Sequence, residues 1–284
     1  MKAFIESLRN RPEGRLPISA YFGYGVGQVG GQIMRDTPAL ILPFYMTTLL
    51  GMEAALASIV ILIAKTWVFF ADPIVGITSD RTETRWGRRR PFILAGGVLA
   101  GIAFYFMFHV PDLQTQVALF FYMAVLYTIM NTGFSSFSVP YLTMATEMSK
   151  DPDERTTIIS FRNTALNVGL IAGGMLAPRL IDWGETPKLG YELMGTVLAF
   201  IIIVSTIWLF FGTAKAPRNI KTDSTVSLMD QLKVAWDNKP FVTLISANIL
   251  QYLSAGMSYT GMLYFLGFYA GVNGFLVLPI MILI

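Results

Sequence analysis

The sequence contains no cysteine, a single histidine and few charged residues. Without cysteine, this chain can form neither a disulfide nor a thiolate metal site. Charged residues make up 14% of its 284 residues and hydrophobic residues 54%, whereas soluble domains carry roughly 25% charged residues. This composition excludes an ordinary soluble domain and indicates a protein that crosses a membrane several times.

Long apolar segments predict where the chain spans the membrane. A spanning helix needs about 20 largely apolar residues, and polar or basic joints separate eight such segments. We expect helices near residues 18–49, 53–78, 91–111, 116–144, 157–180, 191–212, 239–268 and 273–284. The chain stops in the apolar stretch VLPIMILI without a polar tail, so we expect it to be truncated.

Most basic residues gather on one side of these predicted spans. Segments on the side of the N-terminus hold sixteen of the 21 Lys and Arg residues, while the opposite joints hold only Arg179 and Lys188. Basic loops stay in the cytoplasm, so we expect a cytoplasmic N-terminus in a plasma (inner) membrane. The net charge of +3 therefore reflects orientation, and we expect no nucleic-acid partner.

Charged side chains inside spans are candidates for function, because they are costly there unless they face a cavity or a partner. Asp72 lies near the cytoplasmic end of the second span and is followed by Pro73. Lys65 lies two helical turns earlier on the same face. Asp72 either pairs with a cation on a neighbouring helix or exchanges a proton or binds a cation, because apolar surroundings favour its protonated form.

The first span contains a second charged pair, Arg35 and Asp36. Adjacent helical residues point about 100° apart, so we expect these two side chains to find separate partners. Gln32 lies one turn before Asp36 and is expected to line the same cavity.

Polar side chains of the fourth and fifth spans suggest a polar wall. Asn131, Ser135 and Ser138 lie in the fourth span, and the two serines share a face. The alternative for each hydroxyl is a hydrogen bond to its own backbone. Arg162, in the fifth span, offers a fork of donors suited to sugar hydroxyls or carboxylates, and Asp72 is an alternative partner for it.

The sequence shows no arrangement typical of an enzyme. Gly25, Gly27 and Gly30 match a dinucleotide-binding pattern, but they lie in an apolar span with no preceding strand. Small residues there are expected to let helices approach closely. Because no nucleophile with a base, metal-ligand cluster or phosphate loop is present, we expect no enzymatic activity, no metal site and no cofactor.

The joint between the second and third spans has the most specific pattern. Residues 76–90, GITSDRTETRWGRRR, resemble the corresponding loop of the major facilitator superfamily. The preceding ADPIVG and the SFRN sequence around Arg162 are similar to the glycoside-pentoside-hexuronide cation symporters, and the resemblance extends over residues 17–270. It implies a cytoplasmic gate, for which the matching residues are Gly76, Asp80, Arg81, Gly87, Arg88 and Arg89.

This resemblance implies an all-α integral membrane protein of the major facilitator fold. Residues 1–17 would form a cytoplasmic tail, 18–212 an N-terminal six-helix transmembrane bundle and 213–239 a cytoplasmic loop between bundles. Residues 240–284 would begin an incomplete C-terminal bundle. Helical spacing over 227–236 predicts a short interfacial helix, with a loose linker as the alternative.

The resemblance also implies roles for individual residues. Asp72 matches a cation-site aspartate and Arg162 an arginine near the sugar site. The family's fourth-helix positions fall on Ser135 and Ser138 in one alignment, and near Thr128 and Asn131 in another. The expected cation-coupling residues are Asp72 and Ser135, and the expected solute-binding residues are Gln32, Asp36, Asn131, Ser138 and Arg162.

We therefore expect a secondary active transporter that moves a sugar, glycoside or related small polar solute together with a monovalent cation. Two cation ligands of the family fall on Val68 and Ala71. Sodium prefers several oxygen ligands, whereas a proton needs one carboxylate, so we expect coupling to H⁺ rather than Na⁺. The alternatives are a transporter of a lipid or amphipathic solute, and a non-transporting membrane sensor or scaffold.

Overall fold

The computed structural model describes residues 16–149, 151–214, 216, 236–265 and 269, and all regular structure in these residues is helical. In chain order the elements are α2 (Ile18–Phe44), the π-helical turn η1 (Tyr45–Leu49), α3 (Ala54–Arg81), α4 (Arg90–Phe108), α5 (Gln116–Met148), α6 (Pro152–Ile171), the π-helical turn η2 (Ala172–Leu176), α7 (Ala177–Asp182), α8 (Pro187–Gly212) and α10 (Lys239–Tyr264). The predicted span over 273–284, and the predicted helix over 227–236 except for its last residue, lie outside the described residues.

Five helical stretches in the described part of the chain are long and apolar enough to cross a membrane. They are α3, α4, α5, α6 continued through α7, and α8. Helices α2 and α10 also lie where the sequence predicts spans. Helix α2 is less apolar because it contains many glycines and several polar residues. Its polar side chains Gln28, Gln32 and Asp36 are buried in the bundle.

Local sequence explains where two of these helices begin. The Thr115 hydroxyl accepts a hydrogen bond from the backbone N–H of Ala118 at 3.2 Å, which caps α5. A carboxylate oxygen of Asp151 accepts one from the N–H of Asp153 at 3.1 Å, and Pro152 occupies the first turn of α6. These caps supply acceptors for N–H groups that have no partner within the helix.

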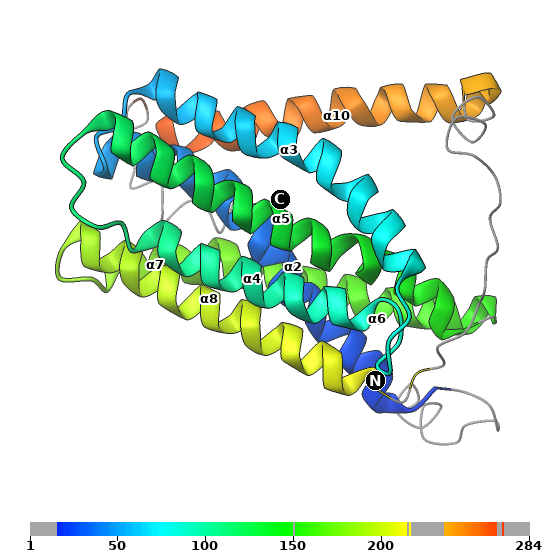
Figure 1. The fold of residues 1–284 in the computed structure, drawn as a ribbon. Coiled ribbons are helices and arrows are strands. Elements are labelled where there is room, and N and C mark those ends of the chain that lie inside the picture. Colours follow the sequence, from blue (N-terminus) through cyan, green and yellow to red (C-terminus); the bar gives the residue numbers. More distant parts are fainter. Residues whose placement is uncertain (1–15, 150, 215, 217–235, 266–268, 270–284) are drawn as a thin grey trace.

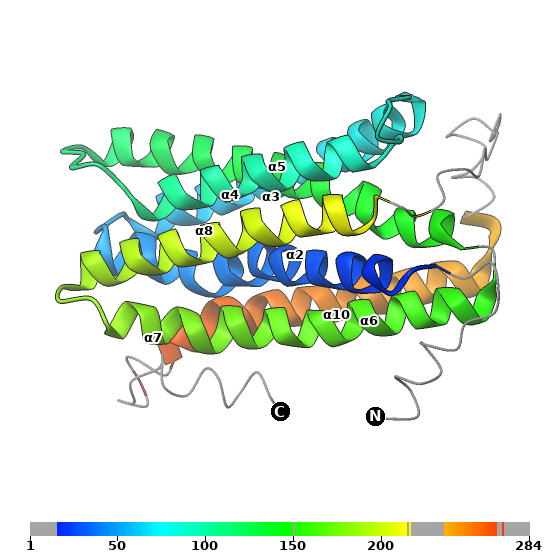
Figure 2. The same ribbon diagram turned by 90° about the horizontal axis from the view of Figure 1, so that it is seen from below.

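The six spans before residue 213 form an arc of neighbouring helices. In order of contact they run α3, α5, α4, α8, α2 and α6. Helix α10 contacts α2 and runs along the edge of this bundle, as Figures 1 and 2 show in two views. Helix α10, which follows the long joint after α8, therefore lies against α2.

Close helix crossings occur at pairs of glycines. A Cβ atom added at Gly96 of α4 would lie 2.6 Å from the carbonyl oxygen of Gly133 in α5. One added at Gly23 of α2 would lie 2.7 Å from the Cα atom of Gly212 in α8.

The expectation that Gly25, Gly27 and Gly30 let helices approach closely is also confirmed. A Cβ atom at Gly27 would lie 2.6 Å from the Leu209 side chain of α8, and one at Gly25 would lie 3.1 Å from the carbonyl oxygen of Phe161 in α6.

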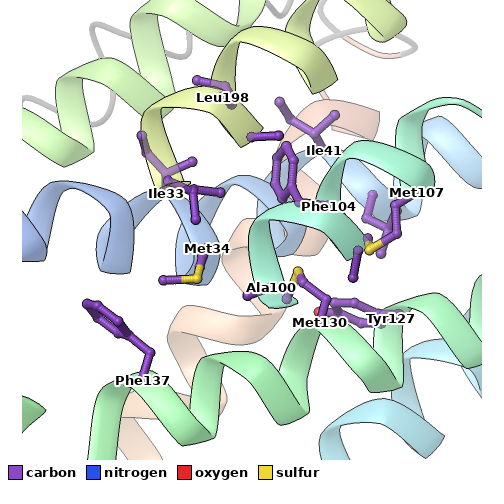
Figure 3. Packing of buried hydrophobic residues seen from close by; sticks show 14 of the residues in the cluster. Ile33, Met34, Ile41, Ala100, Phe104, Met107, Tyr127, Met130, Phe137 and Leu198 are labelled. Carbon is purple, nitrogen blue, oxygen red and sulfur yellow. The ribbon is translucent and has the colours of Figure 1, made fainter. Parts of the chain in front are cut away.

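The apolar core lies where α2, α4, α5 and α8 meet (Figure 3). Ile33 and Met34 of α2, Phe104 of α4, Met130 of α5 and Leu198 of α8 are each at most 1% exposed. Dense packing of these side chains holds the four helices in register. Polar side chains of α2 and α5 occupy other faces of the same helices, where they form the site described next.

Candidate functional site

A chain of hydrogen bonds runs along α2 and reaches α6. Nε of Arg162 donates to Oε1 of Gln28 at 3.1 Å, and Nε2 of Gln28 donates to Oε1 of Gln32 at 3.2 Å. Gln32 then donates to the carboxylate of Asp36. Residues four apart lie on one face of a helix, so the sequence spacing aligns this row. The structure thus joins three predicted solute-binding residues and adds Gln28, which the sequence analysis missed.

Arg35 pairs with the residue next to it. Its Nε lies 3.3 Å from Oδ1 of Asp36, so the expectation that these two side chains find separate partners is wrong. Three flexible methylene groups let the guanidinium bend back, although the two Cα–Cβ bonds diverge. The Arg35 side chain is 52% exposed and that of Asp36 12%, so this ion pair links the outside of α2 to the buried row.

Lys65 of α3 points toward α5. Its Nζ donates to Oδ1 of Asn131 at 3.3 Å and lies 5.5 Å from the centre of the Tyr127 ring. The amide nitrogen of Asn131 in turn donates to the backbone carbonyl of Tyr127 at 2.8 Å. Asn131, a predicted solute-binding residue, is therefore held in a fixed orientation between its own helix and a neighbouring cation.

Asp72 and Ser135 each bury an oxygen atom without a hydrogen-bond partner. Oδ1 of Asp72 and Oγ of Ser135 are buried, and neither forms a hydrogen bond with the residues that the structure describes. No described ion pair joins Asp72 to Arg162, whose observed partner is Gln28. Buried polar atoms are nearly always paired, so each of these oxygens has hydrogen-bonding capacity that no described residue uses.

Contacts between α3 and α5 place Asp72 at the depth of the unpaired serine. Helices α3 and α5 touch at two levels. Lys65 of α3 contacts Asn131 of α5, and further along both helices a Cβ atom at Gly76 would lie 3.8 Å from the side chain of Val139. Asp72 lies between the two contacts on α3, and residues 135–136 lie at the corresponding level of α5. Asp72 and Ser135, the two predicted cation-coupling residues, therefore lie at about the same level on adjacent helices.

Other hydroxyls of α5 differ from Ser135. Thr128 donates to the carbonyl of Ala124 at 2.7 Å, and Thr132 donates to that of Thr128 at 2.8 Å. The hydroxyls of these threonines therefore form hydrogen bonds to the backbone of their own helix, which was the alternative to a polar wall. Ser138 is half-buried one turn beyond Ser135.

Arg89 links three helix ends at the predicted gate. Its guanidinium lies 2.9 Å from Oδ1 of Asp80, at the end of α3, and 2.8 Å from Oε1 of Glu147, at the end of α5. Arg88 adds a longer contact of 3.5 Å to Glu147. Gly87 has φ +98°, in the left-handed region that favours glycine, and turns the chain into α4. Glu147 was not predicted, although it lies in the last turn of a span beside a basic loop.

The two remaining predicted gate residues lie on α3. Arg81 is in the last turn of the helix, where a positive charge interacts favourably with the helix dipole. Gly76 packs toward Val139 of α5 without close contact, since a Cβ there would lie 3.8 Å from the valine side chain. Arg81 forms no ion pair with the described residues, so its part at this helix end is its interaction with the helix dipole.

Glu154, which the sequence analysis also missed, ties the same end of the bundle together. Its Oε1 accepts hydrogen bonds from the backbone N–H of Leu16 and the hydroxyl of Tyr21, both at 2.7 Å. Its Oε2 accepts one from the hydroxyl of Ser149 at 2.5 Å. One buried carboxylate therefore connects the start of α2, the end of α5 and the start of α6.

At the opposite end of the bundle a surface ion pair connects the joint between α4 and α5 to the first turn of α8. Nζ of Lys188 donates to Oδ1 of Asp112 at 2.9 Å. This hydrogen bond and the charge of the ammonium lower the pKa of the Asp112 carboxyl below its ordinary value. Both groups are exposed to solvent, so the pair adds little to stability. Among the described residues no three His, Asp or Glu side chains gather in a way that could hold a metal ion.

Comparisons with known proteins define the class. The chain belongs to the family described as MFS/sugar transport protein, which it matches over residues 23–284. The inner membrane symporter YicJ of Escherichia coli is 25% identical over 258 residues, which cover 90% of this chain and 55% of the relative. The isoprimeverose transporter of Lactiplantibacillus pentosus is 24% identical over 242 residues, which cover 84% of this chain and 50% of the relative. The chain thus spans about half the length of the curated relatives it matches.

The fold agrees with a solved transporter. A crystal structure of a peptide transporter POT in complex with sulfate is similar with a TM-score of 0.55 at 18% sequence identity, over 93% of this chain and 50% of that chain. An identity this low shows the fold alone. Together with the family match and the five apolar spans, it confirms the predicted all-α major facilitator fold and an integral, multi-pass membrane protein.

Proposed function

We propose that the protein is a secondary active symporter that moves a sugar, glycoside or related small polar solute together with a cation. The observation that carries this proposal is the buried, unpaired carboxylate oxygen of Asp72 on a spanning helix of a chain in a transporter family. A carboxylate within a membrane span is costly unless it is paired, protonated or bound to a cation. Its position beside α5 allows coupling to side chains of the solute site.

The proton is the favoured coupling ion. Val68 and Ala71, the positions one turn before Asp72 and next to it, are apolar, and Ser135 offers a single hydroxyl. Sodium requires several oxygen ligands, whereas one carboxyl group in apolar surroundings can bind and release a proton. The Asp36 carboxylate is already held by Gln32 and Arg35, so it does not supply the missing ligands.

The row from Arg162 to Asp36 supplies donors and acceptors for a polar solute. Within the row, Gln28 and Gln32 each accept one hydrogen bond with the amide oxygen and donate one from the amide nitrogen, and Arg162 uses one of its N–H groups. The remaining donors suit the hydroxyls of a sugar. In alternating access, the described bundle would rock against a second bundle with the solute near the midplane. The ion pairs at Arg89 would rearrange as the cytoplasmic ends separate.

The test is uptake into membrane vesicles that contain the protein. A panel of labelled glycosides, pentosides and uronides is offered under an imposed proton gradient or an imposed sodium gradient. We expect one sugar to accumulate with the proton gradient, and Asp72→Asn to abolish accumulation. Asp112→Asn is the matched control, because the same chemical change at an exposed carboxylate should leave uptake unaltered.

Two outcomes would contradict parts of the proposal. Sodium-driven uptake that Asp72→Asn abolishes would exclude proton coupling while keeping symport. If no sugar accumulates under either gradient, the sugar assignment is wrong, and transport of an amphipathic solute or a sensor role becomes the leading interpretation.

A further inference from the structure

The row of hydrogen bonds from Arg162 to Asp36 has a donor at one end and an acceptor at the other. A guanidinium can only donate hydrogen bonds, and an ionised carboxylate can only accept them. Nε of Arg162 therefore requires the amide oxygen of Gln28, and the amide nitrogen of Gln28 then faces Gln32. Gln32 is oriented in the same way and presents its amide nitrogen to Asp36. The charges at the two ends thus fix the orientation of both amides.

Asp36 lies too far along α2 to pair with Arg162 directly. Gln28, which binds Arg162, precedes Asp36 by two intervals of four residues, which corresponds to about 12 Å along the helix axis. Within the described part of the chain, the two glutamines connect the two charges. Aligned hydrogen bonds polarise one another inside a protein, so a negative charge at Asp36 strengthens the bond that Arg162 donates.

Both carboxylate oxygens of Asp36 are engaged within the protein. Oδ2 accepts from Gln32, and Oδ1 lies 3.3 Å from Nε of Arg35. The side chain of Asp36 is only 12% exposed. A solute that bound this carboxylate would have to displace one of the two partners.

Arg162 is placed differently, because it keeps donors for another group. It is half-buried, and its one hydrogen bond among the described residues uses Nε, which leaves the N–H groups of both terminal nitrogens. Its charge acts on the nearby hydroxyls of Tyr24 and Tyr141, but each hydroxyl donates to the backbone carbonyl of the other tyrosine, at 3.1 and 2.8 Å. The two rings stack with their centres 4.5 Å apart, so a rigid pair bounds this end of the row.

From this geometry we propose that Asp36 is a positioning residue, whose charge acts through Gln32 and Gln28 to hold Arg162 in the orientation that binds the solute. This inference rests on the proposed transport function and changes the expected role of Asp36 from solute binding to positioning. Arg162 is the member of the row that contacts the solute, and the two glutamines transmit the charge of Asp36 to it.

The experiment moves the negative charge along the row. Asp36→Asn leaves an amide oxygen that accepts only a neutral hydrogen bond from Gln32. Gln28→Glu places a carboxylate directly on Arg162. In the double variant Gln32 can turn round, donate to the new carboxylate at position 28 and accept from the new amide at position 36. Every member of the row is then paired again.

Initial rates of uptake into vesicles are measured with a sugar of the labelled panel that the unaltered protein accumulates. Asp36→Asn should raise the apparent KM about three- to tenfold with little change in the maximal rate, because a charge-assisted hydrogen bond is roughly twice as strong as a neutral one. Adding Gln28→Glu should return the KM toward the unaltered value, although position 36 still lacks a carboxylate. Asp112→Asn is the matched control and should leave the KM unchanged.

Melting temperatures in detergent provide a second readout that needs no solute. In Gln28→Glu alone the amide of Gln32 lies between two carboxylates, so its oxygen must face one of them. Asp36→Asn should therefore lower the melting temperature of the unaltered protein and raise that of Gln28→Glu. Such a change of sign measures the coupling between the two positions.

The outcomes distinguish this inference from the function on which it rests. If Asp36→Asn raises the KM equally with and without Gln28→Glu, Asp36 contacts the solute itself. Additive changes in melting temperature would show that the row does not connect positions 28 and 36. Either result overturns the inference while sugar symport stands. If the unaltered protein accumulates no sugar, the proposed function fails, and the positioning role fails with it.

Discussion

Nε of Arg89 donates to Oε1 of Glu147 at 2.8 Å, and the side chains of the pair are only 13% and 14% exposed. The same guanidinium also binds Asp80, so one arginine holds the ends of α3 and α5 at the start of α4. A charged group that is largely buried at a helix joint depends on its partner, because removing the partner leaves it without compensation.

Glu147→Gln should therefore destabilise the protein. Removing one partner of a buried, charged hydrogen bond costs about 1–3 kcal/mol, and we expect a lower melting temperature of the purified protein in detergent. Glu83→Gln is the control, because this residue lies in the joint between α3 and α4 that also contains Arg89 and forms no ion pair among the described residues. Equal melting temperatures for the two variants would show that the Arg89 pair contributes nothing.

Glu154→Gln should also loosen the end of the bundle where α2 and α6 begin. An amide retains only one acceptor oxygen, so it cannot accept from Leu16, Tyr21 and Ser149 together. We expect a loss of about 1–3 kcal/mol in the free energy of unfolding. Asp153→Asn, at the neighbouring exposed position, should cost much less.

Protease digestion of the region around Leu16 provides the measurement for Glu154. Cleavage there should be faster in Glu154→Gln than in the unaltered protein, because the N–H of Leu16 loses its charged acceptor. Unchanged cleavage would show that other contacts hold the start of α2.

Gly133→Ala should disrupt the crossing of α4 and α5. Its Cβ would lie 2.7 Å from the backbone nitrogen of Ala100, and backbone cannot move aside as a side chain can. Overpacking of this kind costs typically about 1–3 kcal/mol. Gly256→Ala is the matched control and should be neutral or stabilising, because its Cβ meets nothing within 4 Å and alanine favours a helix. Thermal unfolding of both variants is the measurement. The melting temperature should fall in Gly133→Ala and should stay the same or rise in Gly256→Ala.

The absence of cysteine makes the proposed orientation easy to test. A single cysteine at Glu83, in the basic joint, should react with an impermeant thiol reagent only from the cytoplasmic side. A cysteine at Gln114, in the joint before α5, should react only from the outside, because α4 separates the two joints. Labelling of right-side-out and inverted vesicles measures this. The reverse pattern would invert the proposed topology.

Several features could be predicted because they depend on local sequence. Apolar length and basic joints predict the helices from α3 to α8, since each span must satisfy its backbone within lipid. The pattern around Arg89 predicts a charged gate, and the spacing of Gln32 and Asp36 predicts a shared face. Asp72 also stands out in the sequence, because it is an acidic residue inside an apolar span.

Other features were decided only by tertiary structure. The partners of Arg162, Lys65 and Arg89 lie on other helices, and no spacing along one helix shows which rows will face each other. The ion pair of Arg35 with Asp36 depends on the bend of a flexible side chain, which helical geometry alone does not fix. The sequence by itself determined a membrane bundle with charges at its centre. Packing of the helices decided which partner on a neighbouring helix each of these charges meets.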